Sequence, residues 1–250
     1  MNQPNRLSAG GRIDRSKPME FSFNGHTYTG YAGDTLASAL LANGVSLVGR
    51  SFKYSRPRGI MGHGSEEANA LMQLGQAATT VPNVKATQVE LYPGLVATST
   101  NGWPSVKYDL MAWLGRLGGR FMPPGFYYKT FMFPHKWWLL YEKFIRKAAG
   151  FGRAPQQPDI DIYDKLNHHC DVMVVGGGPA GLAAALQAGR SGKRVILADE
   201  QSELGGSLLV SQQTINGIFA MDWLTEAVAE LTAMAHVVLL HRTTVFGYYD

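Results

Sequence analysis

The sequence has 250 residues, of which 45% are hydrophobic and 17% charged, and it contains a single cysteine. This length and composition fit an ordinary globular protein with one or two domains. One cysteine excludes an intrachain disulfide framework, a four-cysteine zinc site and an iron–sulfur cluster held by this chain alone.

The net charge of +4 is distributed unevenly along the chain. Residues 1–160 carry 18 Lys and Arg against 9 Asp and Glu, whereas residues 161–250 carry 5 against 10. A basic first part is compatible with an acidic partner protein, with nucleic acid or with a solvated face. The sequence shows no signal-peptide core and no apolar run of membrane-spanning length, so we expect a cytoplasmic protein without a membrane segment.

After an extended polar arm, residues 19–29 predict a β-hairpin, because strand-forming aromatic residues flank the turn dipeptide Asn24-Gly25. The next apolar residues recur at helical spacing. Asp34 or Thr35 is suited to cap that helix. A hairpin followed by a short helix is the opening of a ubiquitin-like or ferredoxin-like half-roll, and short strands are expected again between residues 84 and 96.

Residues 50–59 are basic, aromatic and proline-containing, and therefore predict a loop. Alternating cations and aromatic rings can bind single-stranded nucleic acid. This stretch is short, and we expect a structural or subunit-contacting loop without nucleic acid as a partner. Residues 101–155 hold four of the five tryptophans, with helices expected over 107–117 and 136–149, and such an aromatic surface usually packs against another one.

An α/β pattern begins near Cys170. Apolar strands are expected at 172–175, 194–199 and 236–241, alternating with helices at 179–190 and 220–235. This alternation predicts parallel strands, and the continuous apolar run 172–175 predicts a strand buried on both faces. Three strands form an unfinished Rossmann-like sheet, so we expect the front piece of a longer polypeptide.

The predicted fold class is therefore α/β, in three parts. Residues 1–100 form a ferredoxin-like half-roll domain without cluster cysteines. Residues 101–168 form a tryptophan-rich connector. Residues 169–250 form the first part of a Rossmann-like FAD- or NAD(P)-binding domain.

The pattern G-x-G-x-x-G occurs at Gly176, Gly178 and Gly181, between a predicted strand and a predicted helix. The first glycine permits the tight turn, the second lets the backbone approach a pyrophosphate, and the third lets the helix lie close to the sheet. The helix N-terminus offers free N–H groups to the phosphates. Pro179 lacks an N–H, but in the first turn this group would have no acceptor within the helix, so no hydrogen bond is lost.

An acidic pair follows at the end of the next strand. Asp199 lies 18 residues beyond Gly181, and Glu200 is adjacent. A carboxylate there accepts hydrogen bonds from ribose hydroxyls and repels a 2′-phosphate, which favours FAD or NAD over NADP. Sequence spacing does not separate FAD from NAD. The predicted cofactor-binding residues are Gly176, Gly177, Gly178, Pro179, Ala180, Gly181, Asp199, Glu200, Gly205, Gly206 and Ser207.

No catalytic or metal-binding constellation is predicted. The sequence lacks a G-x-S-x-G elbow, an H-E-x-x-H motif and a P-loop. His168, His169 and Cys170 are adjacent and cannot all point at one ion, and Cys170 is expected to be a small half-buried residue. Glu66 and Glu67 could form an acid–base pair, but adjacent carboxylates on a loop are expected to be solvated.

Taken together, these motifs resemble the N-terminal part of the alpha subunit of heterotetrameric sarcosine oxidases. Alpha subunits of amine and opine dehydrogenases and of hydrogen cyanide synthase are related. Members with a [2Fe–2S] cluster carry cysteines soon after the Arg-Pro-Arg-Gly element, whereas residues 60–70 here contain none, so the resemblance implies a domain without a cluster. The segments that carry the resemblance are 30–36, 49–59, 174–181 and 199–206.

The resemblance implies an oxidoreductase that converts sarcosine and oxygen to glycine and hydrogen peroxide and passes a one-carbon unit to tetrahydrofolate. It implies NAD in this chain, with FMN, FAD and tetrahydrofolate elsewhere in a complex with beta, gamma and delta subunits. The catalytic residues are then expected outside this chain. Two alternatives remain open: a subunit of an FAD-containing amine or opine dehydrogenase or of hydrogen cyanide synthase, and a non-catalytic assembly module.

Overall fold

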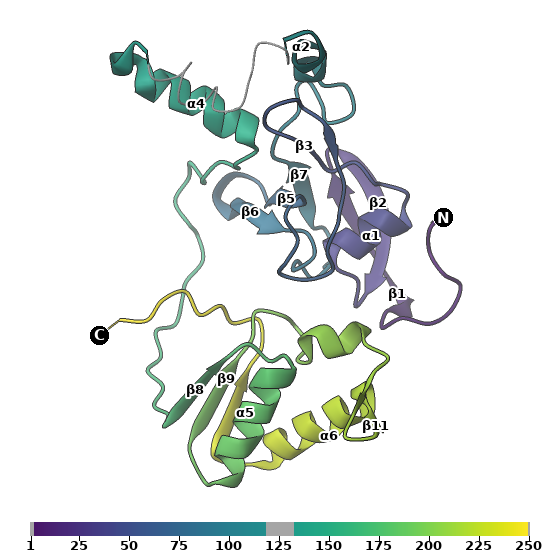
Figure 1. Cartoon of the computed structure of the whole chain (residues 1–250), viewed down its shortest axis with the longest axis vertical. Coiled ribbons are helices and arrows are strands. Elements are labelled where there is room, and N and C mark those ends of the chain that lie inside the picture. The colour runs from purple at the N-terminus through teal and green to yellow at the C-terminus, as the bar shows by residue number, and fades with distance from the viewer. Residues whose placement is uncertain (1–2, 119–132, 250) are drawn as a thin grey trace. The chain divides into compact units, whose positions relative to one another are not determined.

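The computed structural model describes residues 3–118 and 133–249, and the chain forms two compact units, Met1–Asp161 and Ile162–Asp250. Each unit has its own sheet and its own hydrophobic core (Figure 1). Among the described residues, no helix has both the length and the apolar character needed to cross a membrane.

A five-stranded mixed sheet organises the first unit. Its strand order is β2-β1-β7-β5-β6, and only the β1–β7 pair is parallel. The strands are β1 (Asp14–Phe23), β2 (His26–Ala32), β5 (Leu71–Leu74), β6 (Val81–Lys85) and β7 (Val96–Ser99).

The turn between β1 and β2 confirms the predicted hairpin. Asn24 and Gly25 both have positive φ, 50° and 80°, which is the backbone that a two-residue turn of this kind requires. The Asn24 side chain also reaches β7: its Nδ2 donates to Ser99 Oγ (3.0 Å), and its Oδ1 accepts from Ser99 N (2.9 Å). The turn therefore fixes both the hairpin and the position of β7.

Helix α1 (Leu36–Ala42) packs on this sheet through buried side chains that include Leu36 and Leu40. Thr35 is its N-cap: its hydroxyl accepts from Ser38 N, and Ser38 Oγ accepts from Thr35 N. Of the two candidate caps, Thr35 thus fills the role, and Asp34 is used differently.

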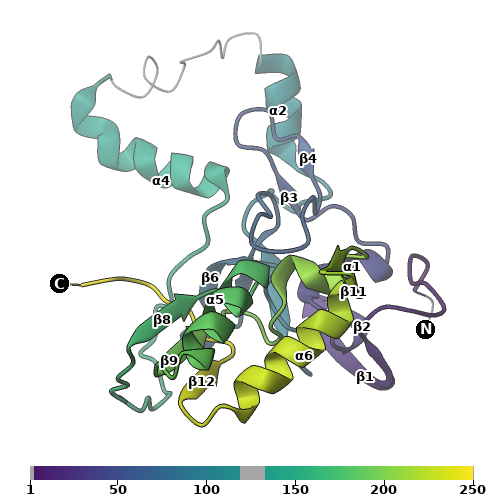
Figure 2. The same ribbon diagram turned by 60° about the horizontal axis from the view of Figure 1, so that its bottom comes forward.

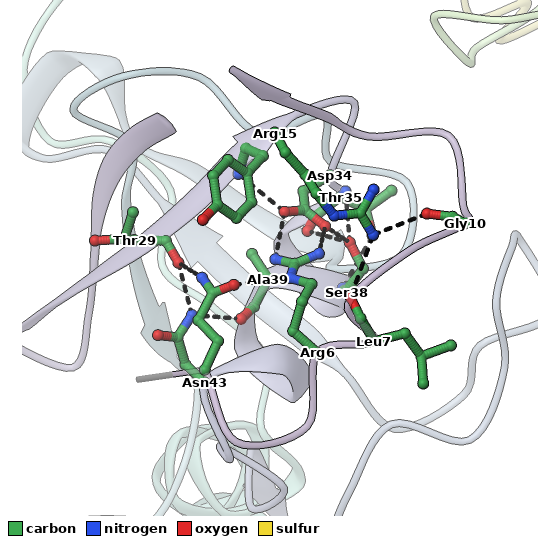
Figure 3. A network of polar contacts seen from close by, with 12 residues as sticks. Arg6, Leu7, Gly10, Arg15, Thr29, Asp34, Thr35, Ser38, Ala39 and Asn43 are labelled. Carbon is green, nitrogen blue, oxygen red and sulfur yellow. Dashed lines mark hydrogen bonds and ion pairs between the residues drawn. The ribbon is translucent and has the colours of Figure 1, made fainter. Parts of the chain in front are cut away.

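Asp34 anchors the N-terminal arm (Figure 3). Its carboxylate accepts from Arg6 Nη1 (2.9 Å) and Nη2 (2.7 Å), from Tyr31 N (2.9 Å) and from Ser38 Oγ (2.7 Å). Asp34 is 1% exposed, so this is a buried bidentate ion pair with its remaining acceptor capacity filled. It joins the arm, the end of β2 and the start of α1.

The remaining elements of the first unit are short or lie outside the sheet. Helices are present where they are predicted, at residues 107–117 and 136–149, although each α-helix begins two or three residues later than predicted. The remaining elements of this unit are β3 (Gly49–Arg50), β4 (Pro57–Arg58), α2 (Leu110–Gly118), α4 (Trp138–Ala149) and 3-10 helices at Ala77–Thr79 and His135–Trp137.

The second unit alternates strands and helices. Its three-stranded parallel sheet has the order β12-β9-β8. A short hairpin, β10–β11, precedes the last helix. The elements are β8 (Val172–Val175), α5 (Pro179–Arg190), β9 (Val195–Ala198), a 3-10 helix (Gly206–Val210), β10 (Thr214–Ile215), β11 (Ile218–Phe219), α6 (Ala220–Ala233) and β12 (Val237–Leu240).

Both long helices of this unit cover one face of its sheet (Figure 2). Each strand lies beside the previous one in the same direction, so two right-handed crossovers place α5 and α6 on the same side. Within the described residues of this unit, no helix covers the other face, where Met173 and Val175 are 46% and 63% exposed. The prediction that strand 172–175 is buried on both faces is therefore wrong for the structure of this chain.

Candidate dinucleotide-binding site

The turn from β8 into α5 has the backbone that the glycine pattern predicts. Gly176 leaves the strand with a φ of +93°, and its N–H donates to Ala198 O at 2.8 Å. Gly178 is the N-cap of α5, and Pro179 occupies the first helical turn. A Cβ on Gly181 would overlap the carbonyl oxygen of Gly176, so the turn requires glycine at that position.

Gly178 differs from its neighbours in what surrounds it. Its φ and ψ of −73° and −175° are open to any residue, and an added Cβ would have no described protein atom within 4 Å. The fold of this unit thus does not explain glycine here. Bare backbone at a helix N-terminus, facing open space, is the surface on which a pyrophosphate binds.

The second glycine segment folds against the first. Gly205 N donates to Gly177 O at 2.8 Å, and a Cβ on Gly206 would lie 3.1 Å from Gly178 Cα. Leu204 is buried beneath the turn, where its side chain would overlap a Cβ on Gly177. Two segments about 28 residues apart in the sequence therefore meet at one place, and predicted cofactor-binding residues from both lie together there.

Asp199 supports the glycine turn directly. Its Oδ2 accepts from Gly177 N at 2.5 Å, and its Oδ1 accepts from Gln201 N at 2.7 Å. Glu200, the other predicted acid, is exposed. A carboxylate has about four acceptor positions, so Asp199 retains capacity for ribose hydroxyls while it holds the turn. This second role of Asp199 was not evident from the sequence.

The other predicted residues lie on the same edge. Pro179 is half-buried, and Ala180 and Ser207 are exposed at the starts of α5 and of the 3-10 helix. The first N–H groups of an α-helix have no intrahelical acceptor, so this edge presents donors and a positive partial charge to an anion.

At the opposite end of the sheet, Asp171 and Arg194 join the starts of β8 and β9. Asp171 Oδ1 accepts from Arg194 Nη2 at 2.7 Å, and Oδ2 accepts from Arg194 N at 2.9 Å. Side-chain and backbone hydrogen bonds from Arg194 lower the pKa of Asp171 to about 2. This pair was not predicted from the sequence, where its signal is an acid and a base that precede adjacent parallel strands.

In the first unit, the basic loop 50–59 is fixed by hydrogen bonds from the Arg50 side chain to backbone carbonyl groups of the same unit. Arg50 Nε donates to Val106 O (2.7 Å), Nη1 to Ser55 O (3.1 Å) and Nη2 to Lys107 O (3.1 Å). The guanidinium thus connects the loop to residues 106–107, which agrees with a structural loop. A cavity of about 500 Å³, lined in part by Tyr54 and Trp113, opens beside it.

The adjacent glutamates of the first unit behave differently from each other. Glu66 is exposed, as predicted, and backbone hydrogen bonds from His63, Glu66 itself and Gly64 lower its pKa to about 2. Glu67 is 2% exposed, so the prediction that both are solvated is wrong for it. Burial alone would raise the pKa of Glu67, but hydrogen bonds from four backbone N–H groups lower it below its ordinary value.

No three His, Cys, Asp or Glu side chains in residues 3–118 and 133–249 are grouped so that they could hold a metal ion. His168 and His169 are exposed, and Cys170 is half-buried.

Two family models match the chain. One, described as a 2Fe-2S iron-sulfur cluster binding domain, matches residues 16–102. The other, described as an FAD dependent oxidoreductase, matches residues 171–237. A solved structure of L-proline dehydrogenase from P. horikoshii superposes with a TM-score of 0.55 at 18% identity, covering 99% of this chain and 37% of that one. That similarity supports the fold.

Curated relatives match along the whole chain. The sarcosine oxidase alpha subunit of Rhizobium meliloti (strain 1021) is 53% identical over 98% of this chain and 25% of its own length. That of Corynebacterium sp. (strain U-96) is 37% identical over 100% of this chain and 22% of its own. A shorter match, to an opine oxidase subunit of Agrobacterium tumefaciens (strain Ach5), is 40% identical over 20% of this chain and 10% of that protein.

The fold, the glycine turn and the family models define the class: a ferredoxin-type domain followed by a dinucleotide-binding domain of the FAD-dependent oxidoreductase type. The relatives make this more specific. The chain is homologous to the N-terminal part of sarcosine oxidase alpha subunits, which confirms the resemblance seen in the sequence, and it spans about a quarter of their length.

The two cofactors named by the family models fit this chain unequally. A [2Fe–2S] cluster needs thiolate ligands, and the only cysteine, Cys170, lies outside residues 16–102. The first domain therefore does not fit a cluster. The glycine turn does fit a dinucleotide, because Gly178 leaves open space where any larger residue would have a side chain.

Proposed function

We propose that this chain is the N-terminal part of a sarcosine oxidase alpha subunit whose second unit binds NAD. The complete enzyme would oxidise sarcosine with oxygen, yielding glycine, hydrogen peroxide and a one-carbon unit that passes to tetrahydrofolate. Its catalytic residues, FMN and FAD would lie outside this chain, in a cytoplasmic complex with beta, gamma and delta subunits. The similarity to sarcosine oxidase alpha subunits, which extends along nearly all of this chain, supports this proposal.

The observation that carries the dinucleotide part is the open space at Gly178. Gly176, Gly177, Gly181 and Gly206 each have a positive φ or a close protein neighbour, so their glycines serve the fold. Gly178 has neither, and a bound pyrophosphate is what would exclude a side chain there. Asp199 and Glu200 at the end of β9 favour a free ribose 2′-hydroxyl, and hence NAD or FAD over NADP.

FAD in the same site is a second candidate. The family model over residues 171–237 is described as an FAD dependent oxidoreductase, and this description favours a flavin nucleotide. Both nucleotides share the adenosine diphosphate portion that the turn would bind, so one experiment can decide between them.

The experiment compares nucleotides released on denaturation from the full-length complex, with and without Gly178→Ala. We expect the variant to keep its thermal stability, because alanine is sterically allowed at that position. The amount of NAD released per protein should fall at least about tenfold. Gly181→Ala is the contrasting variant, in which the turn itself should fail.

Each outcome has a defined meaning. Loss of NAD with unchanged flavin supports the proposal, whereas loss of FAD supports the second candidate. If Gly178→Ala folds and changes neither nucleotide, the dinucleotide site is refuted and a non-catalytic assembly module becomes the better description.

A further inference from the structure

Loop 59–70 of the first unit is built around one buried carboxylate. Glu67 Oε2 accepts from Met61 N and Gly62 N, both at 2.6 Å. Its Oε1 accepts from Asn69 N at 2.6 Å and from Ala70 N at 3.1 Å. All four donors to this carboxylate, within the part of the chain that the structure describes, are backbone N–H groups.

Burial makes this arrangement costly unless it is fully satisfied. An ionised carboxylate removed from water is strongly destabilising without hydrogen bonds, and unbonded N–H groups in the same place would be destabilising as well. Here the four backbone N–H groups and the two oxygens of Glu67 satisfy each other's hydrogen bonds. The loop and the carboxylate therefore depend on one another, since neither is satisfied alone.

The rest of the loop closes over this centre. Exposed Glu66 accepts from His63 N (2.7 Å) and Gly64 N (3.0 Å), both at Oε1. Thr87 Oγ1 donates to Gly64 O at 2.7 Å, and Lys85 Nζ donates to Ser65 O. These contacts attach the loop to β6 and to the segment that follows it.

The position of this loop is informative because the matching family model describes a cluster-binding domain. Plant-type [2Fe–2S] proteins take three ligands from a C-x4-C-x2-C run, which needs a long irregular loop, and the cluster sulfurs accept hydrogen bonds. Between β4 and β5, residues 59–70 form the longest connection between successive strands in residues 16–102 that contains no helix. That loop contains no cysteine, yet its N–H groups converge on an anion.

We propose that the Glu67 carboxylate stands in for the iron–sulfur cluster, as a resident anion that organises loop 59–70 without metal. The first domain would then be a ferredoxin-type scaffold whose cluster loop has become a self-contained structural element. It would hold its shape without iron and carry no electrons.

The test uses the full-length protein in its complex and two matched substitutions. Glu67→Gln replaces one carboxylate oxygen by an NH₂ group, which must face two backbone donors whichever way the amide is turned. Glu66→Gln is the control, because Glu66 is exposed and its hydrogen bonds from His63 N and Gly64 N both fall on one oxygen, which the amide retains.

Amide hydrogen exchange in peptides that cover residues 60–70 is the readout. In the wild type we expect these amides to exchange at least about 1,000-fold more slowly than in an unfolded peptide. Glu67→Gln should lose about 100-fold or more of that protection, and Glu66→Gln less than about tenfold. Added formate, but not chloride, should partly restore protection in Glu67→Ala by filling the vacated position.

Three results would overturn the proposal. The first is rapid exchange of this loop in the wild type. The second is equal effects of the two glutamine variants. The third is iron and acid-labile sulfide bound to this domain in stoichiometric amount. If Glu67→Gln fails to fold, the wild-type exchange and the iron analysis still decide the question.

Discussion

The guanidinium of Arg6 lies bidentate on the carboxylate of Asp34, which is almost fully shielded from solvent. The two residues are 28 positions apart, and the pair fixes an arm that otherwise has little regular structure. Asp34 also accepts from Tyr31 N and Ser38 Oγ, so it joins a strand end to a helix start.

Removing one partner of this pair should be strongly destabilising. Asp34→Ala removes the acceptor of both Arg6 Nη groups and of Tyr31 N, and we expect a loss of about 3–5 kcal/mol in the free energy of unfolding. Arg6→Ala should cost less, since Asp34 keeps two donors. Urea denaturation of both single variants and the double variant measures the coupling, and strictly additive losses would contradict the pair.

Asp199 should matter for stability as well as for binding. Asp199→Ala leaves Gly177 N–H and Gln201 N–H without their acceptor, so we expect about 1–3 kcal/mol of destabilisation together with weaker nucleotide binding. Glu200→Ala should leave thermal stability within about 0.5 kcal/mol of the wild type. Nucleotide retention after gel filtration, measured on both variants, shows which acid contacts the ribose; an effect confined to Glu200→Ala would exclude Asp199.

Replacing Arg50 by lysine should destabilise the protein locally. An ammonium group cannot reach three backbone carbonyls with the geometry of a guanidinium, so Arg50→Lys should destabilise the 50–59 loop by about 1–3 kcal/mol. Arg58→Lys is the control, because the exposed Arg58 guanidinium donates through Nη1 to a side-chain oxygen, Asn69 Oδ1, and a lysine ammonium can make a single bond of this kind as well. Limited proteolysis within the loop, compared with thermal denaturation, reports the difference.

The Asp171–Arg194 pair predicts an acid-sensitive contribution to stability. The pKa of Asp171 is lowered to about 2 in the folded protein, so its ionised form is favoured by folding. The contribution is fully present above the ordinary carboxyl pKa of about 4 and is lost as the pH falls toward 2. The Tm difference between the wild type and Asp171→Asn should therefore be constant from neutral pH to about pH 5, shrink as the pH falls toward 2, and vanish below about pH 2.

That difference should also shrink at high salt, because the pair is solvent-exposed. A difference that persisted unchanged at pH 2 would mean that asparagine acts through something other than charge.

Local chemistry explains which parts of the fold could be predicted from the sequence. The Asn24-Gly25 hairpin, helix α1 and the Gly176–Gly181 turn depend on residues close together in the chain, and all three are confirmed. The hairpin β10–β11 has the same Asn-Gly signal, with φ of 52° and 82° at Asn216 and Gly217, and the same rule would have found it.

Long-range arrangements could not be predicted in this way. Strand β5 pairs with β6 and β7, and nothing in the four residues Leu71–Leu74 specifies those partners. Glu66 and Glu67 are chemically identical in the sequence, and only the folded loop separates an exposed carboxylate from a buried one. The apolar run 172–175 likewise does not reveal how many layers cover the strand.

The contact between Asn24 and Ser99 has a consequence for biosynthesis. These residues are 75 positions apart, so the ribosome releases the first hairpin and its helix well before the strand that pairs in parallel with β1. At about 5–20 residues per second, β1 keeps an unpaired edge for several seconds in every newly made molecule. Nascent chains are therefore most exposed to edge-to-edge association in that interval, and slower translation of residues 26–96 should increase aggregation.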